Sequence, residues 1–332
     1  MIIVNIKGGL GNQMFQYATG KSLSIRKNTR LVINKKKHNL DDNVYQLDKF
    51  KINLEYLEKE SIENITKPDE NYKVLLNILI KYIKNNKILL YFMRMIKKYF
   101  MKFLPDSEAY YNPKHYFKEH KEKEWTTNYK EELFDVSIPC VIEGYFPSYK
   151  YFKDIEENIK KDFSELSVEL SFIGENILEQ IENSNSVSIH FRRGDAVDNN
   201  EVARWYEGIV TNNYYRNSVN YMVKKIGNPH FFIFSNDMSY VKENFRNITK
   251  LDSSINITFV EHNDSSTGYE DLFLMSKCKH NITTGASSFA WWAAFLNNNS
   301  SKIVLRTKEV NGNPRYNFPS DYYPISWIVV DS

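Results

Sequence analysis

Residues 186–195, SVSIHFRRGD, end an apolar run in a histidine, two arginines and a carboxylate. The alternation predicts a β-strand with His190 and Arg192 on one face, near its carboxyl end. In open α/β sheets, ligands bind outside the carboxyl ends of strands. Because guanidinium forks match phosphate oxygens, Arg192 and Arg193 predict a site for a phosphorylated ligand, with Asp195 holding Arg193. The alternative is a surface ion pair between Arg193 and Asp195.

Three further segments show a strand followed by small or polar residues. Residues 1–18, MIIVNIKGGLGNQMFQYA, predict a strand, a glycine loop and a helix. Residues 231–241, FFIFSNDMSYV, predict a strand that ends in Ser-Asn-Asp. Residues 267–296 predict a helix, a short strand and a second helix after a turn of small residues. These segments supply further candidates for the same site.

Together these segments closely resemble the α-1,2-fucosyltransferases, inverting enzymes that transfer fucose from GDP-fucose to galactose. The resemblance is carried by GGLGNQMFQYA, HFRRGD and ASSFAWWAAFL, in the family's order, whereas residues 30–140 carry little of it. It implies a bacterial-type enzyme that decorates a surface glycan such as O-antigen. It also implies a GT-B-like fold, in which two Rossmann-like domains face each other across a cleft.

Composition is that of an ordinary globular protein. The chain has 332 residues, enough for two domains, with 42% hydrophobic and 26% charged residues. A net charge of +3 argues against a nucleic-acid partner. Cys140 and Cys278 form neither a disulfide framework nor a metal motif, and they indicate reduced thiols. Without an apolar stretch of spanning length or a signal peptide, a soluble cytoplasmic protein is expected.

The elements that must position the site alternate along the second half. Strand-like runs and helical patterns follow one another from residue 186 onward, as in βαβ units with a parallel sheet. We therefore expect a GDP-fucose-binding Rossmann-like domain over residues 146–332 and an acceptor-side α/β domain over residues 1–145. Thr211 and Thr267 are expected helix N-caps, the latter in a capping box with Glu270.

Residues 74–104 combine apolar side chains with seven basic ones. Such a segment predicts either a helix lying on an anionic membrane or an amphipathic helix packed on the N-terminal domain. The packed helix is the preferred interpretation. We therefore expect only weak peripheral contact with a membrane.

The departing GDP needs its negative charge stabilised. The sequence has no Asp-x-Asp and no cluster of metal ligands, so no metal or other cofactor is expected. Arginine and a helix N-terminus can supply the charge instead. The resemblance implies that Arg192 contacts the β-phosphate, with Ser287 and Ser288 nearby.

The remaining donor-site candidates follow from the resemblance and from residue chemistry. The resemblance assigns His190 and Asp271 to guanine; the alternatives are a satisfied buried imidazole and a solvated helix residue. Glycines allow close backbone approach to a ligand, and an asparagine supplies a directional amide. The other candidate donor-binding residues are Gly9, Gly11, Asn12, Arg193, Asn236 and Asp237. Trp291 and Trp292 are expected to pack rather than to bind sugar.

A catalytic base would be a carboxylate beyond Arg193. Asp195 is expected to orient Arg193. Asp198 and Glu201 therefore remain as candidates for the catalytic base, and we favour Glu201. Related fucosyltransferases carry a Glu where this chain has Asn200, so a route without a dedicated base stays open. Two other functions also stay open: transfer to a different linkage, and glycan or nucleotide binding without catalysis.

Overall fold

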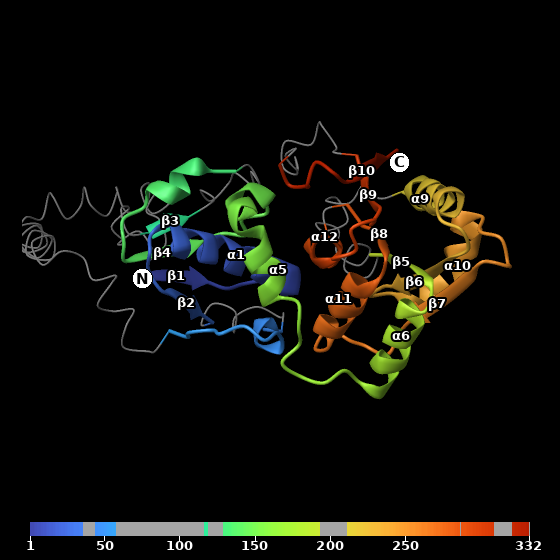
Figure 1. The fold of residues 1–332 in the computed structure, drawn as a ribbon, viewed down its shortest axis with the longest axis horizontal. Coiled ribbons are helices and arrows are strands. Elements are labelled where there is room, and N and C mark those ends of the chain that lie inside the picture. The colour runs from blue at the N-terminus through green and yellow to red at the C-terminus, as the bar shows by residue number, and fades with distance from the viewer. Residues whose placement is uncertain are drawn as a thin grey trace, which may run out of the picture.

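The computed structural model describes residues 1–35, 44–57, 116–118, 129–192, 211–285, 287–308 and 321–331. Figure 1 shows an α/β protein with two separate sheets, each accompanied by helices. The α/β architecture with parallel sheets expected from the sequence is confirmed. The basic segment 74–104 lies outside the described residues, as does the segment 193–210.

The first sheet has four parallel strands in the order β2-β1-β4-β3. Their bounds are β1 Ile2–Asn5, β2 Leu31–Asn34, β3 Tyr116–Lys118 and β4 Cys140–Glu143. Helix α1, Leu10–Arg26, connects β1 to β2. Short 3₁₀ turns and helix α5 complete this half at Leu47–Lys49, Glu131–Asp135, Tyr149–Tyr151, Lys153–Ile155 and Glu156–Asp162. All four residues of β1 are buried, as expected for a central strand with both faces covered.

The second sheet has six parallel strands in the order β10-β9-β8-β5-β6-β7. Their bounds are β5 Asn185–His190, β6 Pro229–Phe234, β7 Asn256–Val260, β8 His280–Ile282, β9 Val304–Thr307 and β10 Ile328–Val330. The helices are α6 Phe172–Glu182, α9 Asn212–Lys225, α10 Met238–Thr249, α11 Gly268–Lys277 and α12 Ser288–Leu296. The predicted alternation of strands and helices is confirmed, while the domain boundary at residue 145 stays a prediction.

Helix α12 joins the two halves (Figure 1). Its sequence SFAWWAAFL is apolar all round, so it is buried between α1 and the second sheet. The ring centroids of Trp291 and Phe15 lie 4.7 Å apart, and Trp292 stacks on Phe152 at 5.4 Å. The Trp291 indole N–H donates to the Tyr322 carbonyl at 2.8 Å. Both tryptophans are therefore packing residues, as expected.

Both predicted N-cap positions are confirmed, but the capping box predicted at Thr267 is wrong. The Thr211 hydroxyl accepts the Tyr214 N–H at 3.1 Å and caps α9. Thr267 makes no side-chain cap to α11; its hydroxyl accepts the Asp264 N–H instead. The Glu270 carboxylate does not complete a capping box, because it is buried against the start of another helix, α6.

Candidate active site

The predicted strand–arginine unit lies at the carboxyl edge of the second sheet. His190 is the last residue of β5, which lies between β8 and β6. Asn236 and Asp237 follow β6, and Ser287 and Ser288 begin α12 beyond β8. Because all three strands are parallel, their carboxyl ends bring these residues to one edge, where open α/β sheets bind ligands.

Neighbouring strands hold the end of β5 in place. The Thr284 hydroxyl donates to the His190 carbonyl, and the Phe191 N–H donates to the Phe234 carbonyl at 2.7 Å. The Ser235 hydroxyl donates to the Phe191 carbonyl. These bonds fix the backbone from which the His190 and Arg192 side chains project. Thr284 was not predicted, although small polar residues after neighbouring strands were a usable signal.

His190 is a neutral imidazole in this site. Its side chain is 8% exposed, and its ring centroid lies 5.5 Å from that of Phe289. Burial, with a smaller contribution from Arg192, lowers the pKa of His190 to about 3. Within the described part of the chain its Nδ1 has no hydrogen-bond partner. The interpretation as a satisfied core histidine therefore fits poorly, and the ring can serve a ligand.

Arg192 is partly buried and lies two residues beyond the end of β5. It is the last residue described before the segment 193–210. Four predicted site residues fall within that segment and outside the described residues: Arg193, Asp195, Asp198 and Glu201. Their roles stay predictions.

The N-terminus of α12 offers backbone donors beside this strand end. Ser287 is buried, and its hydroxyl accepts the Ala290 N–H at 3.4 Å as the helix cap. Ser288 is partly exposed. The unpaired N–H groups and dipole of a helix start favour an anion. Of the two predicted serines, Ser288 thus has the side chain that a ligand can reach.

The start of α1 lies against the start of α12. Gly11, predicted to lie in the glycine loop, is the second residue of α1. A methyl group on Gly11 would lie 2.5 Å from the Ser288 carbonyl carbon and 2.6 Å from the Phe289 nitrogen, an approach that only glycine permits. The other predicted loop residues flank this contact: Gly9 is the N-cap of α1 and Asn12 is its third residue.

Two buried glutamines hold this loop, and sequence reasoning missed both. The Gln16 side chain accepts the Lys7 N–H at 3.0 Å and donates to the Lys7 carbonyl at 3.1 Å. The Gln13 amide donates to the Gly8 carbonyl at 2.9 Å and accepts the Gln46 N–H at 3.0 Å. The sequence did offer a signal for them. Gln13 and Gln16 are three residues apart just after the glycines, so their amides lie on one face of the helix and can hydrogen-bond the preceding backbone.

Gln46 extends this connection to the second half. Its side chain donates to the Ser265 carbonyl at 2.6 Å and accepts the Tyr269 N–H at 2.8 Å, at the start of α11. The side chain is 4% exposed, so these bonds are shielded from water. Hydrogen bonds of the Gln13 and Gln46 side chains therefore link the glycine loop, through residue 46, to the segment that carries Asp271.

Asp271 is partly buried on the first turn of α11. Burial raises its pKa to about 6, although the Asn263 amide, which donates to it at 2.6 Å, acts in the opposite direction. The neighbouring Glu270 accepts bonds from the Ser171 hydroxyl at 2.6 Å and from the His262 ring at 2.7 Å. Glu270 is thus a structural carboxylate, while Asp271 is an oriented one at the edge that carries the site.

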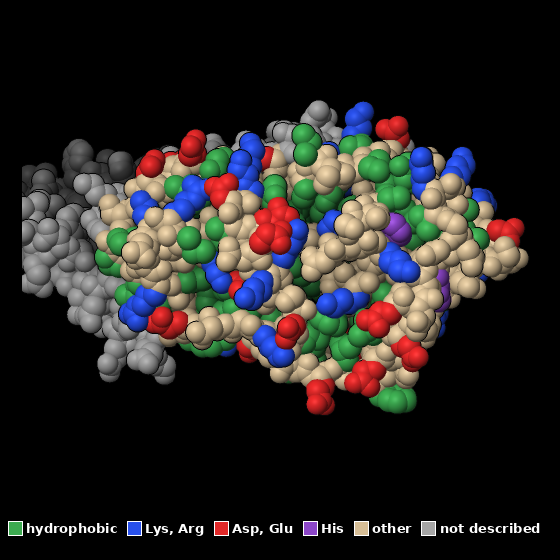
Figure 2. Space-filling view, viewed as in Figure 1, with side chains coloured by type: hydrophobic (Ala, Val, Ile, Leu, Met, Phe, Trp, Pro, Cys, Tyr) green, Lys and Arg blue, Asp and Glu red, His purple; other side chains and the backbone are tan. Residues whose placement is uncertain are grey.

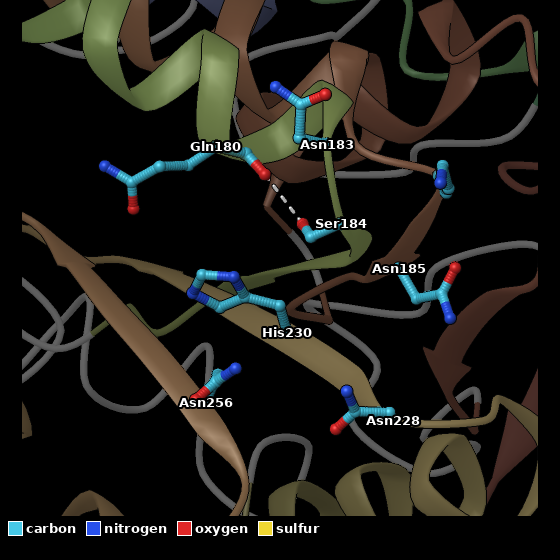
Figure 3. A pocket seen from close by; sticks show the side chains of 8 residues that line it. Gln180, Asn183, Ser184, Asn185, Asn228, His230 and Asn256 are labelled. Atoms are coloured by element: carbon cyan, nitrogen blue, oxygen red, sulfur yellow. Dashed lines mark hydrogen bonds between the residues drawn. The ribbon is translucent and has the colours of Figure 1, made fainter.

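A hollow of about 490 Å³ opens at the opposite edge of the same sheet (Figure 3). It is lined by Gln180, Asn183, Ser184, Asn185, Asn228, His230, Asn256 and Lys279. These residues lie at the amino ends of β5, β6, β7 and β8. Ligands of parallel sheets bind at the carboxyl ends, so we place the active site at the other edge.

Charged side chains of both signs share the described surface. Figure 2 shows Lys and Arg side chains interspersed with Asp and Glu on the visible face. Over the described ranges, no three His, Cys, Asp or Glu side chains gather as metal ligands. No helix in the described part of the chain is long and apolar enough to cross a bilayer.

Comparison with known proteins matches the whole chain. A sequence model of glycosyl transferase family 11 covers residues 1–331. An Escherichia coli α-1,2-colitosyltransferase is 28% identical over 92% of this chain and 90% of its own length. The E. coli O-antigen biosynthesis glycosyltransferase WbnK is 26% identical over 97% of this chain and 98% of its own length. The crystal structure of NodZ α-1,6-fucosyltransferase soaked with GDP-fucose aligns with a TM-score of 0.44 and 12% identity, over 89% of this chain and 92% of that chain.

Proposed function

The chain belongs to glycosyl transferase family 11, and from this premise we propose that it is a galactoside α-1,2-fucosyltransferase. It transfers fucose from GDP-fucose to the 2-hydroxyl of a terminal galactose, with inversion, in O-antigen synthesis. One juxtaposition carries the proposal: Gly11 places the glycine loop against the start of α12, beside the β5 end that carries Arg192. The names of the two E. coli relatives support the linkage and the pathway.

In the proposed donor complex, the Arg192 guanidinium donates two hydrogen bonds to the diphosphate. The Ser288 hydroxyl and the backbone N–H groups at the start of α12 bind the diphosphate from the other side. Gly9, Gly11 and Asn12 bring backbone and amide groups from the first half. Charge that develops on the leaving GDP is then met by groups fixed in advance. Arg193, Asn236, Asp237 and Ser287 remain in the proposed donor site as neighbours of these groups.

Guanine recognition is proposed for Asp271 and His190. A carboxylate can accept both the N1–H and the exocyclic amine of guanine, but only in its ionised form. Because the pKa of Asp271 is raised to about 6, we expect GDP affinity to be constant above that pH and to fall by up to about tenfold per unit below it. Calorimetric titration with GDP between pH 5 and 8 measures this.

The control for this titration is Asp271→Asn, in which no proton is taken up at that site. Its GDP affinity should be weaker throughout, and it should keep only the pH dependence of the diphosphate itself. If wild type and Asp271→Asn follow parallel curves, the base does not bind at Asp271.

We propose that transfer needs no metal, because arginine and a helix start supply the positive charge. After exhaustive treatment with EDTA, the rate should stay within about twofold of the untreated enzyme. Loss of activity on chelation, with recovery on adding manganese or magnesium, would refute this. The assay is the release of GDP in the presence of lactose.

For the base we propose Glu201, with Asp198 as the alternative. Glu201→Gln should lower turnover at least about tenfold while GDP affinity stays unchanged, since the residue does not touch the nucleotide. If Glu201→Gln and Asp198→Asn both keep full activity, an oxocarbenium-like route without a dedicated base is the better account.

A second donor deserves a direct test, because one of the E. coli relatives is named for colitosyl transfer. GDP-colitose and GDP-fucose should be compared with lactose as acceptor, measuring product formation by chromatography. Faster turnover of GDP-fucose supports the proposal. Faster turnover of GDP-colitose would keep the family and the linkage but change the donor. Product formation from either donor would exclude the non-catalytic alternative.

The proposed location is the cytoplasm, at most with weak contact to the inner face of the membrane through residues 74–104. Cys140 and Cys278 are both buried free thiols, which suits a reducing compartment. The seven basic residues of segment 74–104 would attract anionic lipid.

A further inference from the structure

The first sheet has a carboxyl edge of its own. Its four strands are parallel in the order β2-β1-β4-β3, so the carboxyl ends of β1 and β4 lie side by side. Ligands of open parallel sheets bind outside the carboxyl ends of the strands. Asn5 ends β1 and Glu143 ends β4 at this point, and the Asn5 amide donates to the Glu143 carboxylate at 2.9 Å.

The residues just beyond these strand ends form a cluster around Gly8. The Lys7 ammonium lies 4.8 Å from the centroid of the Tyr145 ring. A methyl group on Gly8 would lie 3.2 Å from Tyr145 Cε1 and 3.0 Å from Asn12 Nδ2, so ring and amide both lie against this glycine. Gly8 has φ of +75°, a backbone region that favours glycine. Lys7, Asn12 and Tyr145 are all partly exposed.

The same loop connects this cluster to the donor side. Three residues lie between Lys7 and Gly11, and a methyl group on Gly11 would meet the backbone of Ser288 at the start of α12. Gln13 and Gln16 hold the loop in its shape through bonds to Gly8 and Lys7. A molecule bound at the cluster would therefore lie next to the proposed diphosphate site.

The chemistry of the cluster suits an uncharged sugar. An aromatic ring offers apolar area to the carbon face of a pyranose, while an ammonium and an amide donate to its hydroxyls. The carboxylate nearby, Glu143, is 6% exposed and engaged with Asn5, so it anchors the strand ends rather than repelling or binding a charged ligand.

We propose that Lys7 and Tyr145 form the subsite for the terminal galactose of the acceptor, with Tyr145 as the platform for its ring and with Asn12 at the border to the proposed donor site. This inference rests on the proposed function, since it names where that reaction's second substrate binds. Tyr145 is thereby a specificity-determining residue, and Glu143 with Asn5 holds the strand ends that carry the cluster.

The test separates the two substrates kinetically. In Tyr145→Ala, we expect the KM for lactose to rise at least about tenfold, while the KM for GDP-fucose and the acceptor-free hydrolysis of GDP-fucose stay within about twofold. Tyr145→Phe keeps the ring and should stay near wild type. Lys7→Met keeps the aliphatic stem but loses the ammonium, and should raise the lactose KM alone.

The matched control is Tyr221→Ala, which removes a tyrosine that also packs beside a lysine, Lys225, but on α9 in the other half. It should leave both KM values unchanged. A rise in the donor KM, or no rise in the lactose KM in Tyr145→Ala, would overturn the inference. If Tyr145→Ala does not fold, the test uses Lys7→Met instead. A rise in its lactose KM alone supports the inference, and an unchanged lactose KM or a raised donor KM overturns it. A wild-type enzyme that is inactive on every galactoside would instead refute the proposed function itself.

Discussion

Replacing Arg192 by lysine should lower turnover by about a hundredfold or more, a loss of about 3 kcal/mol in transition-state stabilisation. The residue lies two positions beyond β5, whose end is fixed by hydrogen bonds from Thr284 and Ser235. Because the backbone is held there, the guanidinium would meet the diphosphate of the proposed donor complex in a set direction. Lysine keeps the charge but loses the planar fork that binds two oxygens at once. Steady-state kinetics with saturating lactose measure the effect.

The fold should survive this substitution, since Arg192 is only partly buried at the edge of the sheet. Arg216→Lys is the matched control. That guanidinium bonds the Ile248 carbonyl at 3.1 Å, between α9 and α10, so its replacement should leave kcat unchanged. Kinetics of Arg192→Lys close to those of wild type would move the phosphate site elsewhere.

Gly11→Ala should damage both stability and turnover, although alanine is the better helix former. The helix preference favours alanine by up to about 1 kcal/mol. Against it, the new methyl group would meet the backbone of Ser288 and Phe289, which cannot rotate away. Overpacking of this kind costs about 1–3 kcal/mol. Since α1 and α12 would have to separate where we propose that donor and acceptor meet, we expect at least about a tenfold loss of kcat as well.

Substitutions of two other glycines serve as controls that separate the loss of kcat from the loss of stability. Gly20 lies on the same helix, and a methyl group there would be 2.3 Å from the Val4 side chain, within the core of the first half. Gly20→Ala should therefore lower the melting temperature while the folded enzyme keeps its kcat. Gly227 has no atom within 4 Å of such a methyl group, so Gly227→Ala should change neither. Equal kcat in Gly11→Ala and Gly20→Ala would contradict a catalytic role for the α1–α12 contact.

Local patterns were sufficient to predict the strands of the second sheet, most of the helices that accompany it and the edge at which we propose the site. The alternation in residues 186–191 identifies β5, and the parallel arrangement then places His190 and Arg192 at its carboxyl end. The apolar run of α12 likewise predicts a buried helix. In each case the determining interactions lie within one or two consecutive elements, so the sequence itself displays them.

Contacts between distant segments could not be predicted in this way. Gln46 bonds Ser265 and Tyr269, more than two hundred residues further along the chain. Glu270 matches the spacing of a capping box, yet its carboxylate bonds Ser171, which no local rule anticipates. A tertiary partner thus overrides a local preference. The role of Glu201, which lies outside the described residues, also stays a prediction from the sequence.

The central claim is best tested by the linkage of the product. Purified enzyme, GDP-fucose and lactose should give one trisaccharide, and NMR should show fucose in α linkage to the 2-hydroxyl of galactose. Lactose with the 2-hydroxyl of its galactose replaced by hydrogen should give no product, although GDP-fucose still binds. Fucose on any other hydroxyl, or equal turnover of the deoxygenated acceptor, would contradict the assignment of this chain as a galactoside α-1,2-fucosyltransferase.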